Sequence, residues 1–260
     1  MSQSYADYLK LDALLDLQRP LSEQPEHDEL LFIIIHQVYE LWFKEVLHEF
    51  DALSHALIQN DQPRALHILN RILTIFKTLV GQLDILETMT PRDFLSFRDR
   101  LESASGFQSF QFREIEFLLG LKSPKTLARF TTDSDAHRRL ERRWRQPTIW
   151  DAFLHHIASG GYDVPETLLD RDPTEAIVAS QAVQRLLVRI YREDPALTQI
   201  CERLVDLDEG LQEWRYRHVK MVQRTIGHKI GTGGSSGVDH LLGTLHRPVF
   251  PDLWAIRSEL

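Results

Sequence analysis

Two histidines stand in apolar stretches of this sequence, where an imidazole can bind a metal, carry a proton or form a hydrogen bond. His36 follows Phe32 by four residues, so both side chains lie on the same face of a helix. His218 lies in a series of apolar residues spaced three or four apart, between Trp214 and Met221. A single imidazole in such a seam suits an axial haem ligand, because the porphyrin itself supplies apolar contact. On spacing alone, a core histidine with an ordinary hydrogen-bond partner is the simpler interpretation of each.

An arginine also lies beside apolar residues. Arg98 follows the sequence Phe94-Leu-Ser-Phe and shares a helix face with Phe94. A partly buried guanidinium needs an anionic partner, and its planar fork fits a carboxylate with two hydrogen bonds. Asp93 and Asp99 are the internal candidates, and the carboxylate of a bound ligand is the other.

The stretch Gly231–Gly237 is too rich in glycine for regular structure. A flexible linker, an anion-binding nest and a lid all fit its composition. It is not a phosphate-binding loop of the nucleotide-binding type, because no Gly-Lys-Ser or Gly-Lys-Thr ends it. Dinucleotide-binding, zinc and hydrolase motifs are also missing from the sequence.

Helices are the elements that must position these residues. Apolar residues recur at steps of three and four over long stretches, and strict alternation over strand lengths is not found. We therefore predict an all-α protein with one domain over 1–260 and a small helical insertion at 124–170. Caps, prolines and periodicity set the expected helices at 28–57, 61–87, 90 to about 103–106, 109–119, 172–191 and 195–226, with shorter ones inside 124–170.

Composition narrows the function classes further. The 260 residues carry a net charge of -8, which argues against general nucleic-acid binding. The arginines of 138–145 are interpreted as a solvated helix face. One cysteine permits neither an internal disulfide nor a Cys-x-x-Cys-His haem attachment. The longest apolar run is far too short to span a bilayer, and no signal peptide is recognised, so a cytoplasmic location is expected.

Several segments together resemble one family, the tryptophan 2,3-dioxygenases, in their order and spacing. The resemblance covers about residues 5–257 and is weakest around 124–170. The segments are Tyr5-Ala-Asp-Tyr8-Leu, Phe32-Ile-Ile-Ile-His36-Gln-Val-Tyr-Glu-Leu-Trp42, Phe94-Leu-Ser-Phe-Arg98, Ser105-Gly-Phe-Gln-Ser109, Trp214-Arg-Tyr-Arg-His218 and Gly231-Thr-Gly-Gly-Ser-Ser-Gly237.

This resemblance implies a haem enzyme that inserts O2 across the indole C2–C3 bond of L-tryptophan, giving N-formylkynurenine at the start of the kynurenine route. It implies one non-covalent haem b per subunit, with iron ligated by His218 and with Ser105 and Gly106 as further cofactor contacts. It also implies a homotetramer in which the N-terminal segment is exchanged to a neighbour.

Substrate-binding roles follow from the same resemblance. His36 is implied to meet the indole N–H, Arg98 the substrate carboxylate, and Thr232 the amino-acid end. Phe94 stands where many bacterial members have tyrosine, so a polar contact is expected to be missing there. The other implied substrate-binding residues are Phe32, Ile33, Ile34, Ile35, Tyr5 and Tyr8.

Two other interpretations stay open at this point. One is a related haem-dependent aromatic oxygenase of the tyrosine hydroxylase type, against which Phe32, His36, Arg98 and Thr232 together argue. The other is a helical haem-binding or interaction protein without enzyme activity. If the absorption spectrum of the purified protein shows no haem, only the interaction protein remains.

Overall fold

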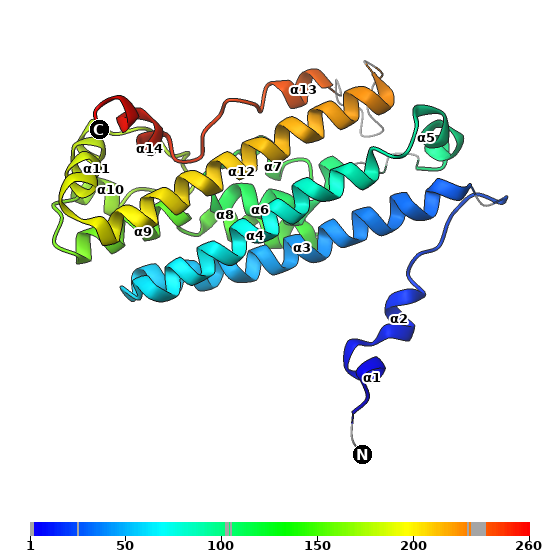
Figure 1. The fold of residues 1–260 in the computed structure, drawn as a ribbon, viewed down its shortest axis with the longest axis horizontal. Coiled ribbons are helices and arrows are strands. Elements are labelled where there is room, and N and C mark those ends of the chain that lie inside the picture. Colours follow the sequence, from blue (N-terminus) through cyan, green and yellow to red (C-terminus); the bar gives the residue numbers. More distant parts are fainter. Residues whose placement is uncertain (1–2, 25, 102–103, 105, 228, 230–237) are drawn as a thin grey trace.

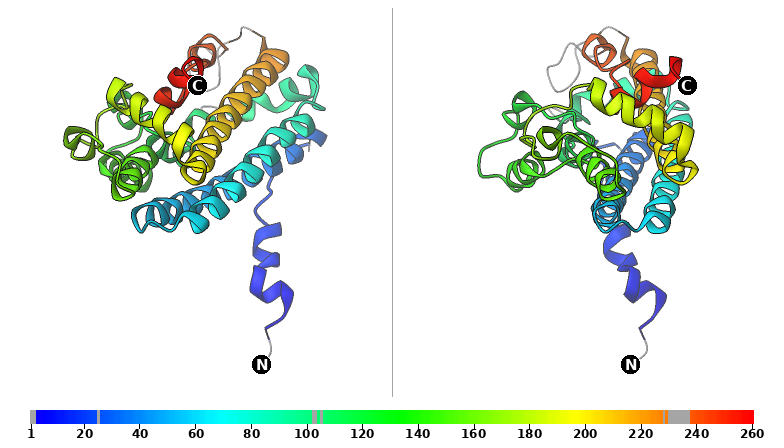
Figure 2. Two further views of the ribbon diagram at one scale, coloured as in Figure 1. Left: turned by 60° about the vertical axis from the view of Figure 1, so that its left-hand side comes forward. Right: turned by 90° about the vertical axis from the view of Figure 1, so that its left-hand side faces the viewer.

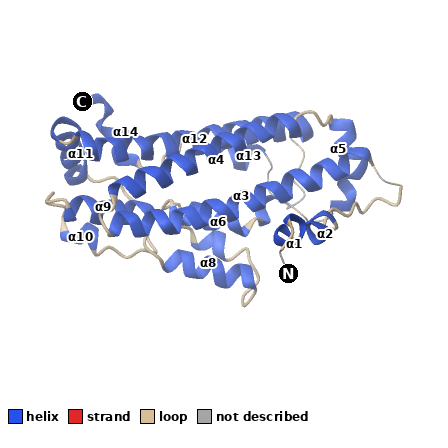
Figure 3. Cartoon of the chain, turned by 60° about the horizontal axis from the view of Figure 1, so that its bottom comes forward, coloured by secondary structure: helices blue, strands red, loops and turns tan. Residues whose placement is uncertain are grey.

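The protein is helical in every part that the structure describes. The computed structural model describes residues 3–24, 26–101, 104, 106–227, 229 and 238–260, and none of these forms a strand (Figure 3). This confirms the predicted all-α class. Within the same residues, every helix falls short of the length and apolar character that a membrane span requires.

Three long helices form the body of the molecule. They are α3 (His27–Ile58), α4 (Gln62–Leu86) and α12 (Pro195–Ile226), and α4 packs against both of the others (Figure 1). Their ends agree closely with the bounds predicted from periodicity. The side chains between them are fully buried, including Phe50, Leu69 and Leu207. Truncating one such leucine to alanine typically costs about 2–5 kcal/mol of stability, so the body should be sensitive to substitutions in this interface.

Predicted capping residues begin two of the helices that carry site residues. The Asp61 carboxylate accepts a hydrogen bond from the backbone N–H of Arg64 at the start of α4. Thr90 and Asp93 form a reciprocal capping box at the start of α5 (Pro91–Phe97). α5 is shorter than predicted, because the chain tightens into a 3-10 helix, η1 (Arg98–Leu101), directly after Phe97.

The middle of the chain supplies shorter helices, as predicted. They are α6 (Phe110–Leu118), α7 (Pro124–Leu127), α8 (Asp135–Arg145), α9 (Ile149–Ser159) and α10 (Glu166–Leu169), after the 3-10 turn η2 (Gly106–Gln108). α9 packs against α3 and adds Trp150 and Phe153 to the main core. α8 packs against α6 around a second, small cluster of Phe117, Leu127 and Leu140. That 124–170 is an insertion stays a prediction.

The arginines of α8 are not the uniformly solvated face that their sequence indicates. Arg143 is buried and forms ion pairs with Asp51 of α3 and Glu114 of α6. Arg139 contacts the other oxygen of Glu114 at 2.8 Å. Glu114 is fully buried, and a buried carboxylate needs cationic partners. The expectation was wrong for Arg143, because its partners come from distant parts of the chain.

The chain between α10 and the last long helix also differs from expectation. α11 spans Gln181–Glu193, whereas the Asp172-Pro173 pair predicted a start at 172. The Asp172 carboxylate accepts hydrogen bonds from the N–H and hydroxyl of Thr174, two residues on. This is the pattern of an Asx turn, so the aspartate closes a turn within the loop and does not cap a helix. Arg171 meanwhile binds the carboxylate of Asp151.

The C-terminal segment lies along α12. α13 (Val238–Leu242) is followed by α14 (Pro251–Ala255) and the 3-10 turn η3 (Ile256–Ser258). Asp208 of α12 is fully buried and accepts hydrogen bonds from the N–H groups of Val249 and Phe250 and from Trp254 Nε1. This one carboxylate therefore fixes the start of α14 on the body.

The N-terminus forms an arm, defined here as residues 3–16, that extends away from the body (Figures 1 and 2). It contains α1 (Tyr5–Leu9) and α2 (Leu11–Leu15), and neither helix has a buried residue. The arm therefore gains little stability from packing within its own subunit.

Candidate functional site

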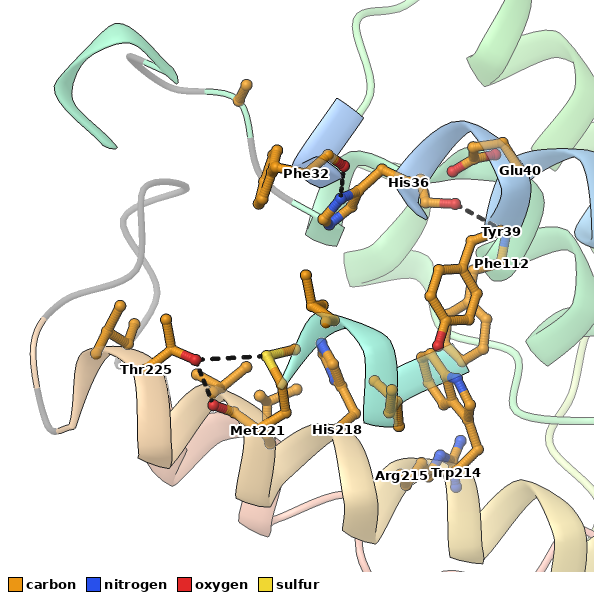
Figure 4. A pocket seen from close by; sticks show the side chains of 18 of the residues that line it. Phe32, His36, Tyr39, Glu40, Phe112, Trp214, Arg215, His218, Met221 and Thr225 are labelled. Atoms are coloured by element: carbon orange, nitrogen blue, oxygen red, sulfur yellow. Dashed lines mark hydrogen bonds between the residues drawn. The ribbon is translucent and has the colours of Figure 1, made fainter. Parts of the chain in front are cut away.

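Both singled-out histidines line one cavity, between the N-terminal half of α3 and the C-terminal half of α12. Its volume is about 250 Å³. Figure 4 shows His36 on α3 and His218 on α12 extending toward each other from opposite sides. Most of the wall is apolar or aromatic, with contributions from Tyr39, Phe43, Leu83, Leu86, Met89, Phe94, Phe112, Trp214, Met221, Val222, Ile226 and Leu241.

A backbone hydrogen bond fixes the orientation and the proton position of His36. Its Nδ1 lies 2.7 Å from the carbonyl oxygen of Phe32, one turn earlier on α3 (Figure 4). A carbonyl only accepts, so Nδ1 carries the proton, and in the neutral ring Nε2 is left as an acceptor. Burial lowers the pKa of His36, and the Phe32 carbonyl and the charge of Glu40 oppose this only in part. The ring is therefore a neutral hydrogen-bond acceptor at pH 7.

Aromatic rings surround His36. The Phe32 ring lies 4.0 Å from the imidazole, centroid to centroid, and 5.8 Å from the ring of Phe94. Phe97, which is fully buried, contacts both phenylalanines at about 5.6 Å and 5.5 Å and supports them from behind. Such a wall favours a flat apolar ligand group, and Phe94 has no hydroxyl to offer it.

On the opposite side, His218 lies against Trp214. Their rings are stacked, with centroids 5.1 Å apart and planes inclined by 12°. The imidazole has no hydrogen-bond partner among the described residues. Burial first, then the charges of His36 and Arg113, lower the pKa of His218 to about 4. A neutral imidazole facing a cavity has a lone pair that a metal ion can use.

Charged side chains occupy another part of the wall. Glu116 of α6 pairs with Arg113, one turn earlier, and with Arg215 of α12 at 3.0 Å. Arg215 is buried, and Glu116 nearly so. This part of the wall therefore places two guanidinium groups beside one carboxylate. On the α3 side, Gln111 donates a hydrogen bond to Glu40 at 2.8 Å.

The structure brings together many of the residues predicted for the site. Phe32, His36, Phe94, Arg98, Gly106 and His218 all line the cavity, although they come from four separated stretches of chain. Ser105 and Thr232 lie outside the described residues.

Other predicted residues are not part of this cavity wall. Ile35 is buried in the core and Ile34 is exposed, so these neighbours of His36 point elsewhere, and Ile33 is half-buried outside the lining. Tyr5 and Tyr8 are exposed by 76% and 72% on the arm. Their substrate-binding roles stay predictions.

Sequence reasoning did not single out the polar residues Glu40, Arg113 and Glu116 as site residues. Arg215, Arg217, Lys220 and Arg224 surround His218 in the sequence, and spacing alone left open whether they face water or meet haem propionates. Glu40 follows His36 by four residues, which is a usable indication. The pairing of Glu116 with Arg215 has no local indication, because it joins residues 99 positions apart.

Comparison with known proteins identifies the family. The sequence model described as tryptophan 2,3-dioxygenase matches residues 1–159 and 164–260. The chain is 59% identical to the tryptophan 2,3-dioxygenase of Herpetosiphon aurantiacus, with all of both chains covered. It is 52% identical to that of Anaeromyxobacter dehalogenans, over 99% of this chain and 96% of the relative. A Bacillus thuringiensis relative of the same name is 40% identical over all of this chain and 93% of its own. The chain belongs to the tryptophan 2,3-dioxygenase family.

Proposed function

We propose that this protein is a haem-dependent dioxygenase that converts L-tryptophan and O2 to N-formylkynurenine, at the start of tryptophan catabolism by the kynurenine route. The observation that carries the proposal is the aromatic cavity with one neutral histidine on each side, in a chain that matches the family over nearly its full length. The reaction breaks the indole C2–C3 bond, and each of the two carbons takes one oxygen atom.

The residues of the cavity fit haem b. His218 offers a neutral imidazole without a competing hydrogen bond among the described residues, so it would serve as the protein ligand of the iron. The apolar wall suits the porphyrin, and Arg113 and Arg215, which also line the cavity, would be the residues to hold its carboxylates. Cys201 lies buried in the core, so the haem is held without a thioether bond. When bound, the haem supplies the redox chemistry with O2, and the protein supplies orientation and polarity.

His36 orients the indole. Its Nδ1–H is used by the Phe32 carbonyl, so Nε2 accepts a hydrogen bond from the indole N–H. The N–H of indole is far too weak an acid for a neutral imidazole to deprotonate, and the contact therefore positions the ring and polarises it. The rings of Phe32 and Phe94 exclude water from the same side.

Arg98 holds the polar end of the substrate. It follows Phe94 by one helical turn and lines the same cavity, so the guanidinium and the indole site are within one small molecule's length. A carboxylate binds both prongs of the guanidinium fork, which lysine cannot reproduce. Thr232 is proposed to contact the amino-acid end of the substrate, and this role rests on the sequence resemblance alone.

The arm acts on a neighbouring subunit of a homotetramer. Tyr5 and Tyr8 are exposed and belong to a segment whose two helices have no buried residue in their own subunit. A short terminus of this kind is ordered by what it docks on, and tyrosine offers an apolar ring with a polar tip for a wet pocket. We infer that both rings close the cavity of a second copy.

Reconstitution tests this function. Purified protein loaded with haem should show a Soret band that depends on His218, and in its ferrous form it should convert L-tryptophan to N-formylkynurenine, detected by its absorbance. Arg192→Lys, on the exposed surface far from the cavity, is the control and should behave as wild type. Stable haem binding without N-formylkynurenine would refute the proposed function and leave two interpretations, a haem-dependent aromatic oxygenase with another substrate and a non-enzymatic haem-binding protein.

A further inference from the structure

The segment that joins the arm to the body is bound tightly to α3. This segment, the arm root, is defined here as residues 17–22. Glu29, in the first turn of α3, accepts hydrogen bonds from the backbone N–H of Leu21 at 2.6 Å and of Ser22 at 3.2 Å. Each carboxylate oxygen receives one of the two donors, so both the position and the direction of the root are specified.

A second attachment lies two turns further along α3. Gln37 donates to the carbonyl oxygen of Leu17 at 3.2 Å and accepts from the side chain of Gln18 at 2.6 Å. The arm root thus follows α3 from Glu29 to Gln37, a distance of about 12 Å for eight helical residues. The arm itself, beyond Leu17, makes no comparable attachment and extends away from the body (Figure 1).

Glu29 is more deeply buried than an acidic residue in the first turn of a helix usually is. It is 2% exposed, although acidic residues in a first turn are normally solvated. Burial alone would raise its pKa, but the hydrogen bonds from residues 21–22 and the charge of Arg100 outweigh it and leave the pKa below its usual value. The group is therefore a buried carboxylate anion whose hydrogen-bond donors come from the arm root.

The two attachments bracket the residues that shape the cavity. Phe32 and His36 lie between Glu29 and Gln37 on the same helix. A continuous helix is stiff over two turns, so the direction in which the arm leaves the subunit is fixed relative to that subunit's own cavity. In a symmetric oligomer the same relation sets where each arm arrives on its neighbour.

We propose that Glu29 is a positioning residue for the neighbouring subunit's site: it fixes the arm root on α3 so that the arm reaches the cavity of a second copy of this chain. The inference rests on the proposed exchange of the arm. In this proposal Glu29 contacts neither substrate nor haem, and it acts on the cavity of the neighbouring subunit.

The alternative is that Glu29 acts only on the cavity of its own subunit, and the experiment must distinguish the two roles. Arg100 of η1 contributes to the low pKa of Glu29, and η1 begins at Arg98 of the subunit's own cavity. Loss of Glu29 can therefore disturb its own subunit's site as well as the arm. The two roles predict effects in different subunits of a mixed oligomer.

The variant is Glu29→Gln, which keeps the shape but leaves one acceptor oxygen where two N–H groups need partners. Glu23→Gln is the matched control, because Glu23 is exposed in the same part of the chain. With haem bound and circular dichroism unchanged, Glu29→Gln should raise the KM for L-tryptophan about tenfold, the fold-change at the low end for a charge-assisted hydrogen bond. Glu23→Gln should leave KM unchanged.

Mixed oligomers locate the effect. One chain lacks residues 1–10 and keeps an intact cavity; the other keeps its arm and carries Arg98→Ala. Co-refolding this pair should restore part of the activity. Glu29→Gln in the chain that donates the arm should reduce the restored activity about tenfold, whereas the same change in the truncated chain should leave it intact. Gln37→Ala, at the second attachment, should follow the same pattern more weakly.

An effect that follows the truncated chain would overturn the proposal, because Glu29 would then act on its own cavity. Equal effects in both positions, or no effect in either, would overturn it too. If the parent pair forms mixed oligomers without restored activity, arm exchange itself fails and the role of Glu29 fails with it. That result leaves haem binding and product formation by the intact protein unaffected, so the two failures are distinguishable.

Discussion

Removing the acceptor nitrogen of His36 should weaken catalysis modestly and only for substrates that have an indole N–H. The perturbation is His36→Leu, which replaces the imidazole beside Phe32 by an apolar side chain of similar length. The Nδ1–H of His36 is already used by the Phe32 carbonyl at 2.7 Å, so the single contact available to a substrate is the lone pair of Nε2. The substitution therefore removes one neutral hydrogen bond from the substrate complex.

The expected size follows from that count. A neutral hydrogen bond contributes about 0.5–1.5 kcal/mol, so kcat/KM for L-tryptophan should fall by about 2- to 13-fold. The wild-type enzyme should use 1-methyl-L-tryptophan poorly, because a methyl group then faces Nε2. For this substrate His36→Leu should leave kcat/KM unchanged or raise it, since no hydrogen bond is lost and the clash is relieved.

The acid limb of the pH profile gives a second readout of the same contact. Protonation of Nε2 turns the acceptor into a donor that opposes the indole N–H. Burial lowers the pKa of His36, so in the wild type this loss should occur below pH 6.5 and not at it. His36→Leu should lack this step.

Steady-state assays with both substrates, at matched haem content, decide the matter. A loss of several orders of magnitude for L-tryptophan, with haem and tryptophan still bound, would mean that His36 is an obligate base and would refute the hydrogen-bond argument. Equal losses on both substrates would refute it as well.

Three further predictions concern other residues. His218→Ala should lose tightly bound haem while the helical circular dichroism survives, and a normal Soret band with full activity would rule out the ligand assignment. Arg98→Lys should raise the KM for L-tryptophan at least tenfold, as expected for a charge-assisted pair, but should hardly change turnover of tryptamine, which lacks the carboxylate; equal penalties would contradict the clamp. His156 is buried, and burial lowers its pKa against the opposing hydrogen bond to Leu57. The unfolded chain therefore binds this proton more readily, so stability should fall as pH drops below 6.5. His156→Gln should show a shallower decline in chemical denaturation, and identical slopes would exclude the residue as a cause.

The fold was predictable where the sequence of a single helix shows the helical periodicity or the capping residues. The periodicity of α3 and α12 and the capping residues of α4 and α5 are local, and the structure follows them closely. The start of α11 was mispredicted, because the Asp172-Pro173 pair serves a turn closed by Thr174. One dipeptide is compatible with both outcomes, and only the bonding of the aspartate side chain decides between them.

In the candidate site, too, residues with a local sequence signal were predictable and those that depend on tertiary packing were not. Phe32, His36 and Phe94 are predictable, because helical spacing sets them on shared faces and the family resemblance connects them. The pairing of Glu116 with Arg215 was not, since it depends on how α6 packs against α12. Arg143 shows the same limit, because its ion pairs with the exposed Asp51 of α3 and the buried Glu114 of α6 depend on the tertiary fold.

The central claim is that the cavity directs both atoms of O2 into tryptophan, and one single-turnover experiment tests it most directly. The haem-loaded ferrous protein is mixed anaerobically with L-tryptophan, exposed to isotopically heavy O2, and quenched for mass spectrometry. The account predicts N-formylkynurenine containing two heavy oxygen atoms. A hydroxylated amino acid containing one heavy atom, with the other lost to water, would contradict it and would assign the protein to hydroxylation chemistry.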